Sequence, residues 1–206
     1  MYNLFYYDIT KLSDALFEKE LTSLPLLRQK EILKKANIDD RKRSLAGDML
    51  AKKYLSKIYG VPPEKLTFAK GEHGKPYVIN IPAHFNISHS GKYTVLAVSD
   101  RPIGIDIEEI REFSAITARK LFSEEELSYV AGNDPSRRKS LMQQCFFEVW
   151  TAKEAFLKYL GTGLSGGMTS LLLEVQNGKL TPKNQKVRLT YDYSIPDAVI
   201  AIISDI

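Results

Sequence analysis

Cysteine, histidine and long uncharged apolar runs are all scarce in this chain of 206 residues. The single cysteine, Cys145, excludes an internal disulfide and a metal site made of cysteines alone, which agrees with a reducing compartment. The three histidines do not have the spacing of a zinc site. The first ten residues lack the basic start and apolar run of a signal peptide, and no early segment is long and uncharged enough to span a bilayer. We therefore expect a cytoplasmic protein that makes no membrane contact.

Other absences narrow the function further. The chain contains no Gly-x-x-x-x-Gly-Lys-Ser/Thr loop and no kinase signature, which argues against those classes of phosphoryl-transfer enzyme. Its 29 basic residues outnumber its 25 acidic residues only slightly, and the net charge of +4 is too small for a typical nucleic-acid-binding surface. A content of 44% hydrophobic and 26% charged residues suits one large domain or two closely packed halves.

The most unusual stretch is Ile103 to Glu108, IGIDIE, where two carboxylates interrupt an apolar run. Side chains alternate between the faces of an extended strand, so Asp106 and Glu108 point to one face, and Ile105 and Ile107 to the other. Two neighbouring acids repel each other unless one of them is protonated or a cation lies between them. The pattern therefore indicates a strand that presents a cation-binding pair of acids.

Around this strand, the chain alternates helical and extended segments. Periodicity and turn residues predict helices at 13–21, 24–36, 39–59, 123–131 and 134–160, and strands at 2–9, 66–69, 77–79, 93–99, 170–176, 186–193 and 198–204. Candidate start or turn signals are Ser23 with Pro25, Ser123 with Glu126, Asp134 with Pro135, and Asn177 with Gly178. Both halves have a long helix followed by short strands, without a repeat at the level of residues.

The last predicted helix carries a third acid and two lysines. Glu154 and Lys158 are four residues apart on one face, which is consistent with an ordinary surface ion pair worth about 0.3–0.5 kcal/mol. Alternatively, they join the acids of the strand. Lys153 lies close to the apolar stripe, where its ammonium must reach solvent or find an anion. Three acids with basic neighbours would suit magnesium and a phosphate ester.

Three other stretches offer donors for an anion. Arg43 lies at the start of a long helix, where a basic turn is either simply solvated or meets a phosphate at the positive helix end. Lys75 is held out by a turn rich in glycine and proline. Ser88 and His89 lie in the crowded stretch FNISHS, which is either a serine-rich surface turn or a group of phosphate donors.

Taken in order, four motifs resemble those of the 4′-phosphopantetheinyl transferases, in their larger monomeric form. These motifs are GKP at 74–76, FNISHS at 85–90, IGIDIE at 103–108 and W-x-x-KE-A-F-x-K at 150–158. The resemblance runs along nearly the whole chain and is specific because the motifs occur together in family order. It implies an α+β fold of two similar halves, 1–102 and 103–206, related by a pseudo-twofold axis. Coenzyme A would bind in the cleft between them.

Carried onto this sequence, the resemblance implies a function for each motif. Asp106, Glu108 and Glu154 would bind Mg²⁺, with Mn²⁺ as a substitute. The implied contacts to coenzyme A are Arg28, Arg43, Lys75, Ser88, His89, Lys153 and Lys158. His89 and Arg43 would bind the 3′-phosphate. Relatives also use basic side chains on the second helix for this phosphate, but here an acid, Glu31, accompanies Arg28. That departure leaves the strength of 3′-phosphate recognition open.

The implied reaction transfers the 4′-phosphopantetheine arm of coenzyme A to a serine of an apo peptidyl or acyl carrier protein. It would activate nonribosomal peptide, polyketide or fatty acid synthases. Glu154 and Lys158 are the expected catalytic residues. The segment 111–130 combines apolar residues with Arg119 and Lys120, which suits either an acidic helical partner or packing on its own domain. The resemblance implies a monomer.

Overall fold

The computed structural model describes residues 1–132, 138–163, 167–183 and 186–206. The elements up to residue 99 are β1 (Tyr2–Asp8), α1 (Asp14–Thr22), α2 (Leu26–Leu33), α3 (Ile38–Tyr59), β2 (Phe68–Lys70), β3 (Pro76–Val78), β4 (His84–Ser90) and β5 (Tyr93–Ser99), with 3-10 turns at Ile9–Lys11 and Pro63–Lys65. The elements that follow are β6 (Ile103–Glu109), α4 (Ala115–Leu121), α5 (Glu124–Ala131), α6 (Lys139–Leu160), β7 (Leu173–Gln176), β8 (Lys179–Pro182), β9 (Val187–Asp192) and β10 (Ala198–Asp205). None of the described helices is long and apolar enough to cross a membrane.

The two series of elements have the same order. Each consists of a strand, two short helices, a helix of 22 residues, a two-stranded hairpin and two more strands. In each series, the first strand and the last two strands form an antiparallel three-stranded sheet. The strand orders are β1-β5-β4 and β6-β10-β9. We call the elements from β1 to β5 the N-terminal half and those from β6 to β10 the C-terminal half.

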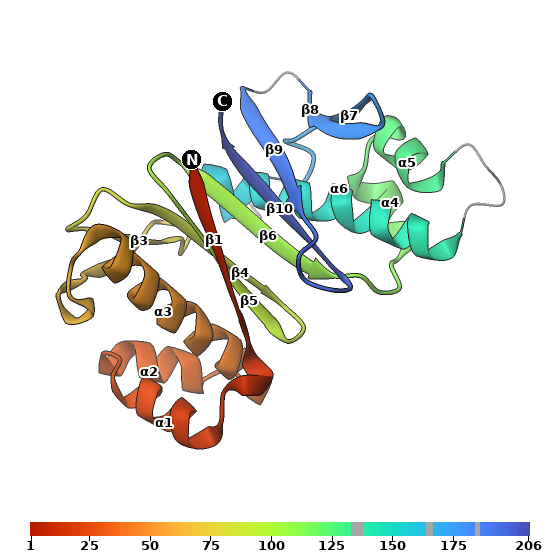
Figure 1. The fold of residues 1–206 in the computed structure, drawn as a ribbon. Coiled ribbons are helices and arrows are strands. Elements are labelled where there is room, and N and C mark those ends of the chain that lie inside the picture. The colour runs from red at the N-terminus through yellow and green to blue at the C-terminus, as the bar shows by residue number, and fades with distance from the viewer. Residues whose placement is uncertain (133–137, 164–166, 184–185) are drawn as a thin grey trace.

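The two sheets lie between the two long helices (Figure 1). The central strands β5 and β10 bury both of their faces, in agreement with the alternation of side chains along a strand. Val95 and Ala97 of β5 pack against β6 and β10, while Leu96 and Val98 pack with α3. The layers are therefore stacked as α3, first sheet, second sheet and α6.

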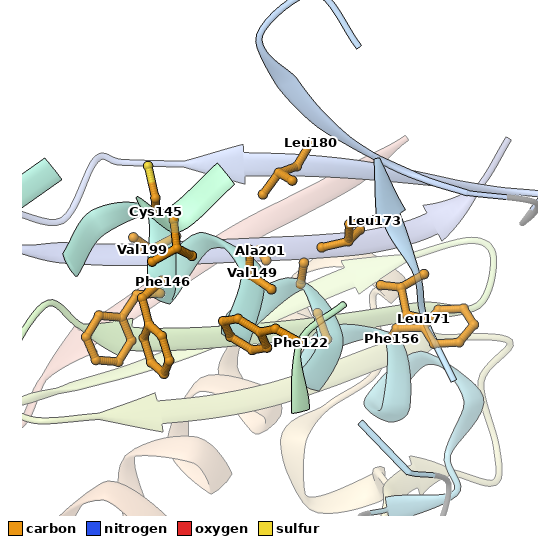
Figure 2. Packing of buried hydrophobic residues seen from close by; sticks show 14 of the residues in the cluster. Phe122, Cys145, Phe146, Val149, Phe156, Leu171, Leu173, Leu180, Val199 and Ala201 are labelled. Carbon is orange, nitrogen blue, oxygen red and sulfur yellow. The ribbon is translucent and has the colours of Figure 1, made fainter. Parts of the chain in front are cut away.

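The largest apolar cluster joins α6 to the outer face of the second sheet (Figure 2). Val149, Ala152 and Phe156 of α6 pack with Val199 and Ala201 of β10. The ring of Phe146 stacks on that of Phe113 at a centroid distance of 4.4 Å, which adds aromatic packing to the buried area. Cys145 is buried in the same cluster, as expected for a packing residue. This cluster fixes α6 on the sheet and hence the positions of its polar side chains.

Several local predictions are confirmed and others are wrong. Ser123 and Glu126 form the capping box of α5. Asn177 and Gly178 have positive φ angles in the β7–β8 turn, whose second strand was not predicted. Ser23 does not cap α2, because it keeps a helical conformation as the C-cap of α1 and its hydroxyl donates to the carbonyl of Glu20. The predicted helix start at Asp134 and Pro135 lies outside the described residues.

Candidate active site

The acidic strand β6 lies directly under α6. A Cβ atom on Gly104 would come within 2.0 Å of the carbonyl oxygen of Ala155 and 2.4 Å of the amide nitrogen of Tyr159. Only glycine permits so close an approach of strand and helix. The isoleucines of β6 face the sheet interface, so the alternating Asp106 and Glu108 face the helix side.

A cavity of about 450 Å³ opens where β4, β6 and α6 meet. Its lining residues are Ile87, Ser88, His89, Asp106, Glu108, Trp150, Glu154 and Lys158. The fold thus brings together six of the residues singled out in the sequence, from three segments and both halves. Trp150 belongs to the fourth motif and is an additional lining residue.

Lys158, Ser88 and Asp106 form a tight polar cluster. The Lys158 ammonium donates to Asp106 Oδ1 at 2.6 Å and to the Ser88 hydroxyl at 2.7 Å. The Ser88 hydroxyl donates to the same Asp106 oxygen at 2.7 Å. Burial raises the pKa of Asp106, while Lys158 and Ser88 oppose the shift. The Glu154–Lys158 pair is therefore not an ordinary surface ion pair, because Lys158 is bound to Asp106.

The second oxygen of the Asp106 carboxylate, Oδ2, is buried without a hydrogen-bond partner among the described residues. A buried unpaired oxygen of a carboxylate is costly unless a donor or a cation reaches it. Among the residues lining the cavity, this atom points most clearly to a ligand.

The other two carboxylates lie on the same cavity in different environments. Glu108 accepts from the Ser90 hydroxyl at 2.9 Å and from Arg111 at 2.8 Å. Burial raises the pKa of Glu154, the charge of Asp106 raises it further, and Lys158 opposes the shift. Mutual repulsion of these acids is the physical signal that a cation is needed between them.

The three acids suit a hard divalent cation as a donor set, because all their donor atoms are carboxylate oxygens and one of them has no partner. Within the described part of the chain, however, no three His, Cys, Asp or Glu side chains are close enough to form a ready metal site. Lys158 holds Asp106 and Arg111 holds Glu108. Binding a cation would therefore require Lys158 and Arg111 to move away from these carboxylates.

Positive groups gather beside the cavity on the N-terminal half. The pKa of His89 is lowered first by desolvation and then by the charges of Lys158, Arg43 and Lys35. Arg43 donates to the carbonyl oxygen of Gly91 and to Asp40. An anion bound between His89 and Arg43 would relieve this repulsion of like charges.

The structure does not bring the remaining predicted contacts, Lys75, Lys153 and Arg28, into this cavity. The Lys75 ammonium donates to the backbone carbonyl oxygens of Ile103, Lys158 and Tyr159. Desolvation by burial lowers the pKa of Lys75 to about 8. The residue lines a separate cavity of about 280 Å³. It therefore ties the N-terminal half to the end of α6.

Lys153 finds its anion inside the protein. Its side chain is 1% exposed and pairs with Glu126 at 2.9 Å, and it also donates to the carbonyl oxygen of Leu171 at 2.6 Å. The Glu126 side chain is 0% exposed. Because this pair is buried among α5, α6 and the start of β7, a contact between Lys153 and coenzyme A has no support in the geometry.

Arg28 is occupied by two acids. It donates to Asp48 on α3 at 2.9 Å and to Glu31 at 2.8 Å. Glu31 also binds Lys70 at 2.6 Å, and these hydrogen bonds lower the pKa of Glu31 to about 2. Glu31 therefore competes with any phosphate for the cations around it.

The predicted docking segment is divided between core and surface. Phe122 is buried, and Phe113 packs against Phe146 in the cluster of the C-terminal half. Ile116 is 68% exposed, and Arg119 and Lys120 on the same helix, α4, are exposed as well. Packing on its own domain thus accounts for some of the apolar residues but not for Ile116.

Two residues of β4 that contact the acidic strand were missed in the sequence. Asn86 and Ser90 flank Ser88 at every second position of β4, and all three contact β6 through their side chains. The period-two pattern of polar residues in FNISHS was the available signal, since it marks one face of a strand.

Models of two protein families match the chain side by side. The 4′-phosphopantetheinyl transferase superfamily matches residues 102–202, and the N-terminal region of 4′-phosphopantetheinyl transferases matches residues 12–101. The 4′-phosphopantetheinyl transferase psf-1 of Bacillus pumilus is 35% identical over 164 residues, which are 77% of this chain and 69% of that protein. This chain belongs to the 4′-phosphopantetheinyl transferase superfamily.

Other relatives of the superfamily agree. The 4′-phosphopantetheinyl transferase gsp of Aneurinibacillus migulanus is 39% identical over 66% of this chain and 56% of its own length. Sfp of Bacillus subtilis is 36% identical over 69% of this chain and 63% of its own length. The chain thus spans about 56% to 69% of these three relatives. A solved Thermotoga maritima holo-[acyl-carrier-protein] synthase, at 22% identity, covers 50% of this chain and 62% of its own with a TM-score of 0.41.

Proposed function

We propose that this protein transfers 4′-phosphopantetheine from coenzyme A to a serine of an apo carrier protein. The serine oxygen attacks the β-phosphorus of coenzyme A, and a new phosphorus–oxygen bond forms. The bond from this phosphorus to the bridging oxygen breaks, and 3′,5′-ADP leaves with the electron pair. The products are the carrier with its phosphopantetheine arm and 3′,5′-ADP.

One observation carries the proposal. Three carboxylates, a lysine, a serine and a histidine from β4, β6 and α6 line one cavity at the meeting of the two halves. The superfamily membership makes this cavity the natural place for the reaction. The matching order of elements in residues 1–102 and 103–206 supports the pseudo-twofold arrangement and a substrate cleft between the halves.

The groups proposed to bind coenzyme A are those that reach the cavity or its basic rim. His89 and Arg43 would bind the 3′-phosphate, and Ser88 and Lys158 would bind the pyrophosphate. For Lys75, Lys153 and Arg28 we propose structural roles instead, because internal partners engage their side chains.

Asp106, Glu108 and Glu154 would hold Mg²⁺, for which Mn²⁺ could substitute, through carboxylate oxygens. When bound, the ion would offset the negative charge that grows on the bridging oxygen. Lys158 is the residue proposed to neutralise the leaving group, because its ammonium lies in the same cavity and binds Asp106, one of the proposed ligands of the ion.

Glu154 is the proposed acceptor of the serine proton. No described side chain hydrogen-bonds to Glu154 in the structure, and burial and its acidic neighbours raise the pKa of its carboxyl. A raised pKa makes a carboxylate a stronger base at neutral pH. Transfer of the proton to Glu154, directly or through a water molecule, would make the serine oxygen nucleophilic as it attacks.

We further propose that α4 takes part in capture of the carrier through Ile116, Arg119 and Lys120. These side chains are exposed, and an acidic helical partner would match their charge. The protein would act as a cytoplasmic monomer without nucleic acid or membrane.

The test is the intact mass of an apo carrier protein incubated with this protein, coenzyme A and magnesium. We expect a gain of one phosphopantetheine that disappears in a chelated control and in Asp106→Ala. Absence of a gain across several peptidyl and acyl carriers, with coenzyme A still bound, would instead indicate a binding protein.

A further inference from the structure

Among the described residues, no strand forms a backbone ladder with the edge of β6 that faces β4. On its other edge, β6 pairs with β10 in an antiparallel ladder, with Asp106 opposite Ala201. Backbone groups of alternate residues point to opposite edges of a strand. The amides of residues 105, 107 and 109 therefore point toward β4, where buried N–H groups require acceptors.

Side chains of β4 supply these acceptors in place of a backbone ladder. The amide of Ile105 donates to Asn86 Oδ1 at 2.8 Å, and that of Ile107 to Ser88 Oγ at 3.4 Å. The amide of Glu109 donates to Ser90 Oγ at 3.1 Å. We call Asn86, Ser88 and Ser90 the side-chain ladder. It fixes the alignment of β6 on β4 across the boundary between the halves.

Ser90 also holds the carboxylate of Glu108. Its hydroxyl accepts from the Glu109 amide and donates to Glu108 Oε2 at 2.9 Å. Both of its hydrogen bonds are thus made to β6, and one of them is made to a residue proposed to bind the cation. Asn86, which is 4% exposed, fixes the same strand four residues earlier without touching an acid.

We propose that Ser90 is a positioning residue for Glu108, and that the side-chain ladder presents the acids of β6 to the cavity. The inference rests on the proposed function, because it assigns Glu108 to cation binding. Hydrogen bonds that orient a metal-binding carboxylate strengthen the site, and their loss typically weakens metal affinity by about 10- to 100-fold.

The experiment measures Mn²⁺ binding to the full-length protein by electron paramagnetic resonance, without substrates. Ser90→Ala should weaken Mn²⁺ binding by about 10-fold or more, and Ser90→Thr, which keeps the hydroxyl, should restore most of it. Ser99→Ala is the matched control, because Ser99 is a buried β5 serine that likewise accepts a backbone amide, that of Arg101 at 3.1 Å. It should leave Mn²⁺ affinity unchanged.

Asn86→Leu separates alignment of the strand from contact with the acid. We expect faster hydrogen exchange in β6, because the Ile105 amide loses its acceptor, together with weaker Mn²⁺ binding. Ser90→Ala should instead speed exchange mainly at Glu109.

Two outcomes would overturn the inference in different ways. If wild type binds Mn²⁺ and loses it in Asp106→Ala, but Ser90→Ala binds it as tightly as wild type, the positioning role is wrong and the metal site stands. If wild type shows no Mn²⁺ binding that Asp106→Ala removes, the proposed metal site is wrong, and the role of Ser90 falls with it.

Discussion

The two halves are built alike but carry different side chains at matching places. β6 begins 101 residues after β1, and α6 begins 101 residues after α3. Both long helices have 22 residues and end at a glycine in the left-handed conformation, Gly60 and Gly161. The backbone therefore repeats closely between the halves.

The acids of β6 have aromatic counterparts in β1. At the same offset, Asp106 and Glu108 correspond to Phe5 and Tyr7. Phe5 stacks on Tyr54 of α3 at a centroid distance of 3.6 Å, and both residues pack against an apolar cluster of the N-terminal half. What is a polar cavity under α6 is thus a filled aromatic layer under α3. The comparison teaches that the repeated scaffold supplies the geometry, whereas a few acids determine where the chemistry lies.

The largest effect is expected from making β6 resemble β1 in charge. Asp106→Asn should lower the transfer rate by about 1,000-fold, which corresponds to an activation free energy higher by about 4 kcal/mol. The reason is that the cavity loses the carboxylate whose Oδ2 has no hydrogen-bond partner among the described residues. Rates of phosphopantetheine transfer to an apo carrier measure this. The control is Glu112→Gln, since Glu112 is an exposed acid three residues beyond β6. A rate near that of wild type would show that Asp106 is dispensable.

Glu154 distinguishes α6 from α3, which has Lys53 at the matching place. Glu154→Gln should slow turnover by about 100-fold at saturating magnesium, because the proposed proton acceptor is lost, while coenzyme A still binds. Single-turnover kinetics and a binding titration separate the two effects. Near-normal turnover would contradict the proposed role.

The aromatic layer of the N-terminal half should respond through stability alone. Phe5→Ala should lower the free energy of unfolding by about 2 kcal/mol, somewhat less than for a fully buried phenylalanine, because Phe5 is only partly buried. Urea unfolding gives the value, and Tyr6→Ala is the control because Tyr6 is 54% exposed. Loss of transfer in a folded Phe5→Ala protein would mean that this layer takes part in the reaction.

The basic side chains of α4 are proposed to bind the carrier and to take no part in the chemical step. Replacing both Arg119 and Lys120 with glutamate should raise the KM for the carrier by about 10-fold, mainly through slower association, and leave coenzyme A affinity unchanged. The effect should shrink at high salt. Weaker coenzyme A binding in this variant would point to misfolding instead.

The smallest effect concerns Lys75, which links the halves. Its folded pKa of about 8 lies below the ordinary lysine value of 10.5. Between these pH values the unfolded chain binds more protons than the folded one, so this group makes stability rise with pH. From pH 7.5 to 10, the free energy of unfolding of wild type should rise by about 1 kcal/mol relative to that of Lys75→Met, as measured by denaturant unfolding. If the difference in free energy of unfolding stayed constant over this pH range, Lys75 would be better solvated than the structure indicates. Lys57→Met is the control, because Lys57 is exposed.

Local patterns in the sequence predicted much of the fold. Periodicity predicted both long helices, and the segment 93–99 coincides with β5. The β8 strand was not predicted, because its sequence KLTP ends in proline and contains one β-branched residue and no aromatic residue. The two acids of β6 were found because their alternation is local.

The contacts between distant elements were not predictable in this way. The family resemblance assigned Lys153 to coenzyme A, and its place near the apolar stripe showed only that its ammonium needs an anion. Glu126 of α5, which meets that need, comes close to Lys153 only in the folded protein. Asn86 and Ser90 were missed because their partners lie on β6, across the boundary between the halves.

The side-chain ladder also has a consequence for biosynthesis. The ribosome releases β4 before β6, so the face of the first sheet that will meet the second sheet is uncovered while the second sheet is still being made. Asn86 and Ser88 are paired across β4 and β5 with Ala97 and Val95, which lie on this face. An uncovered apolar face can associate with another nascent chain and so aggregate. The polar side chains of the ladder interrupt the apolar surface of this face until β6 covers it.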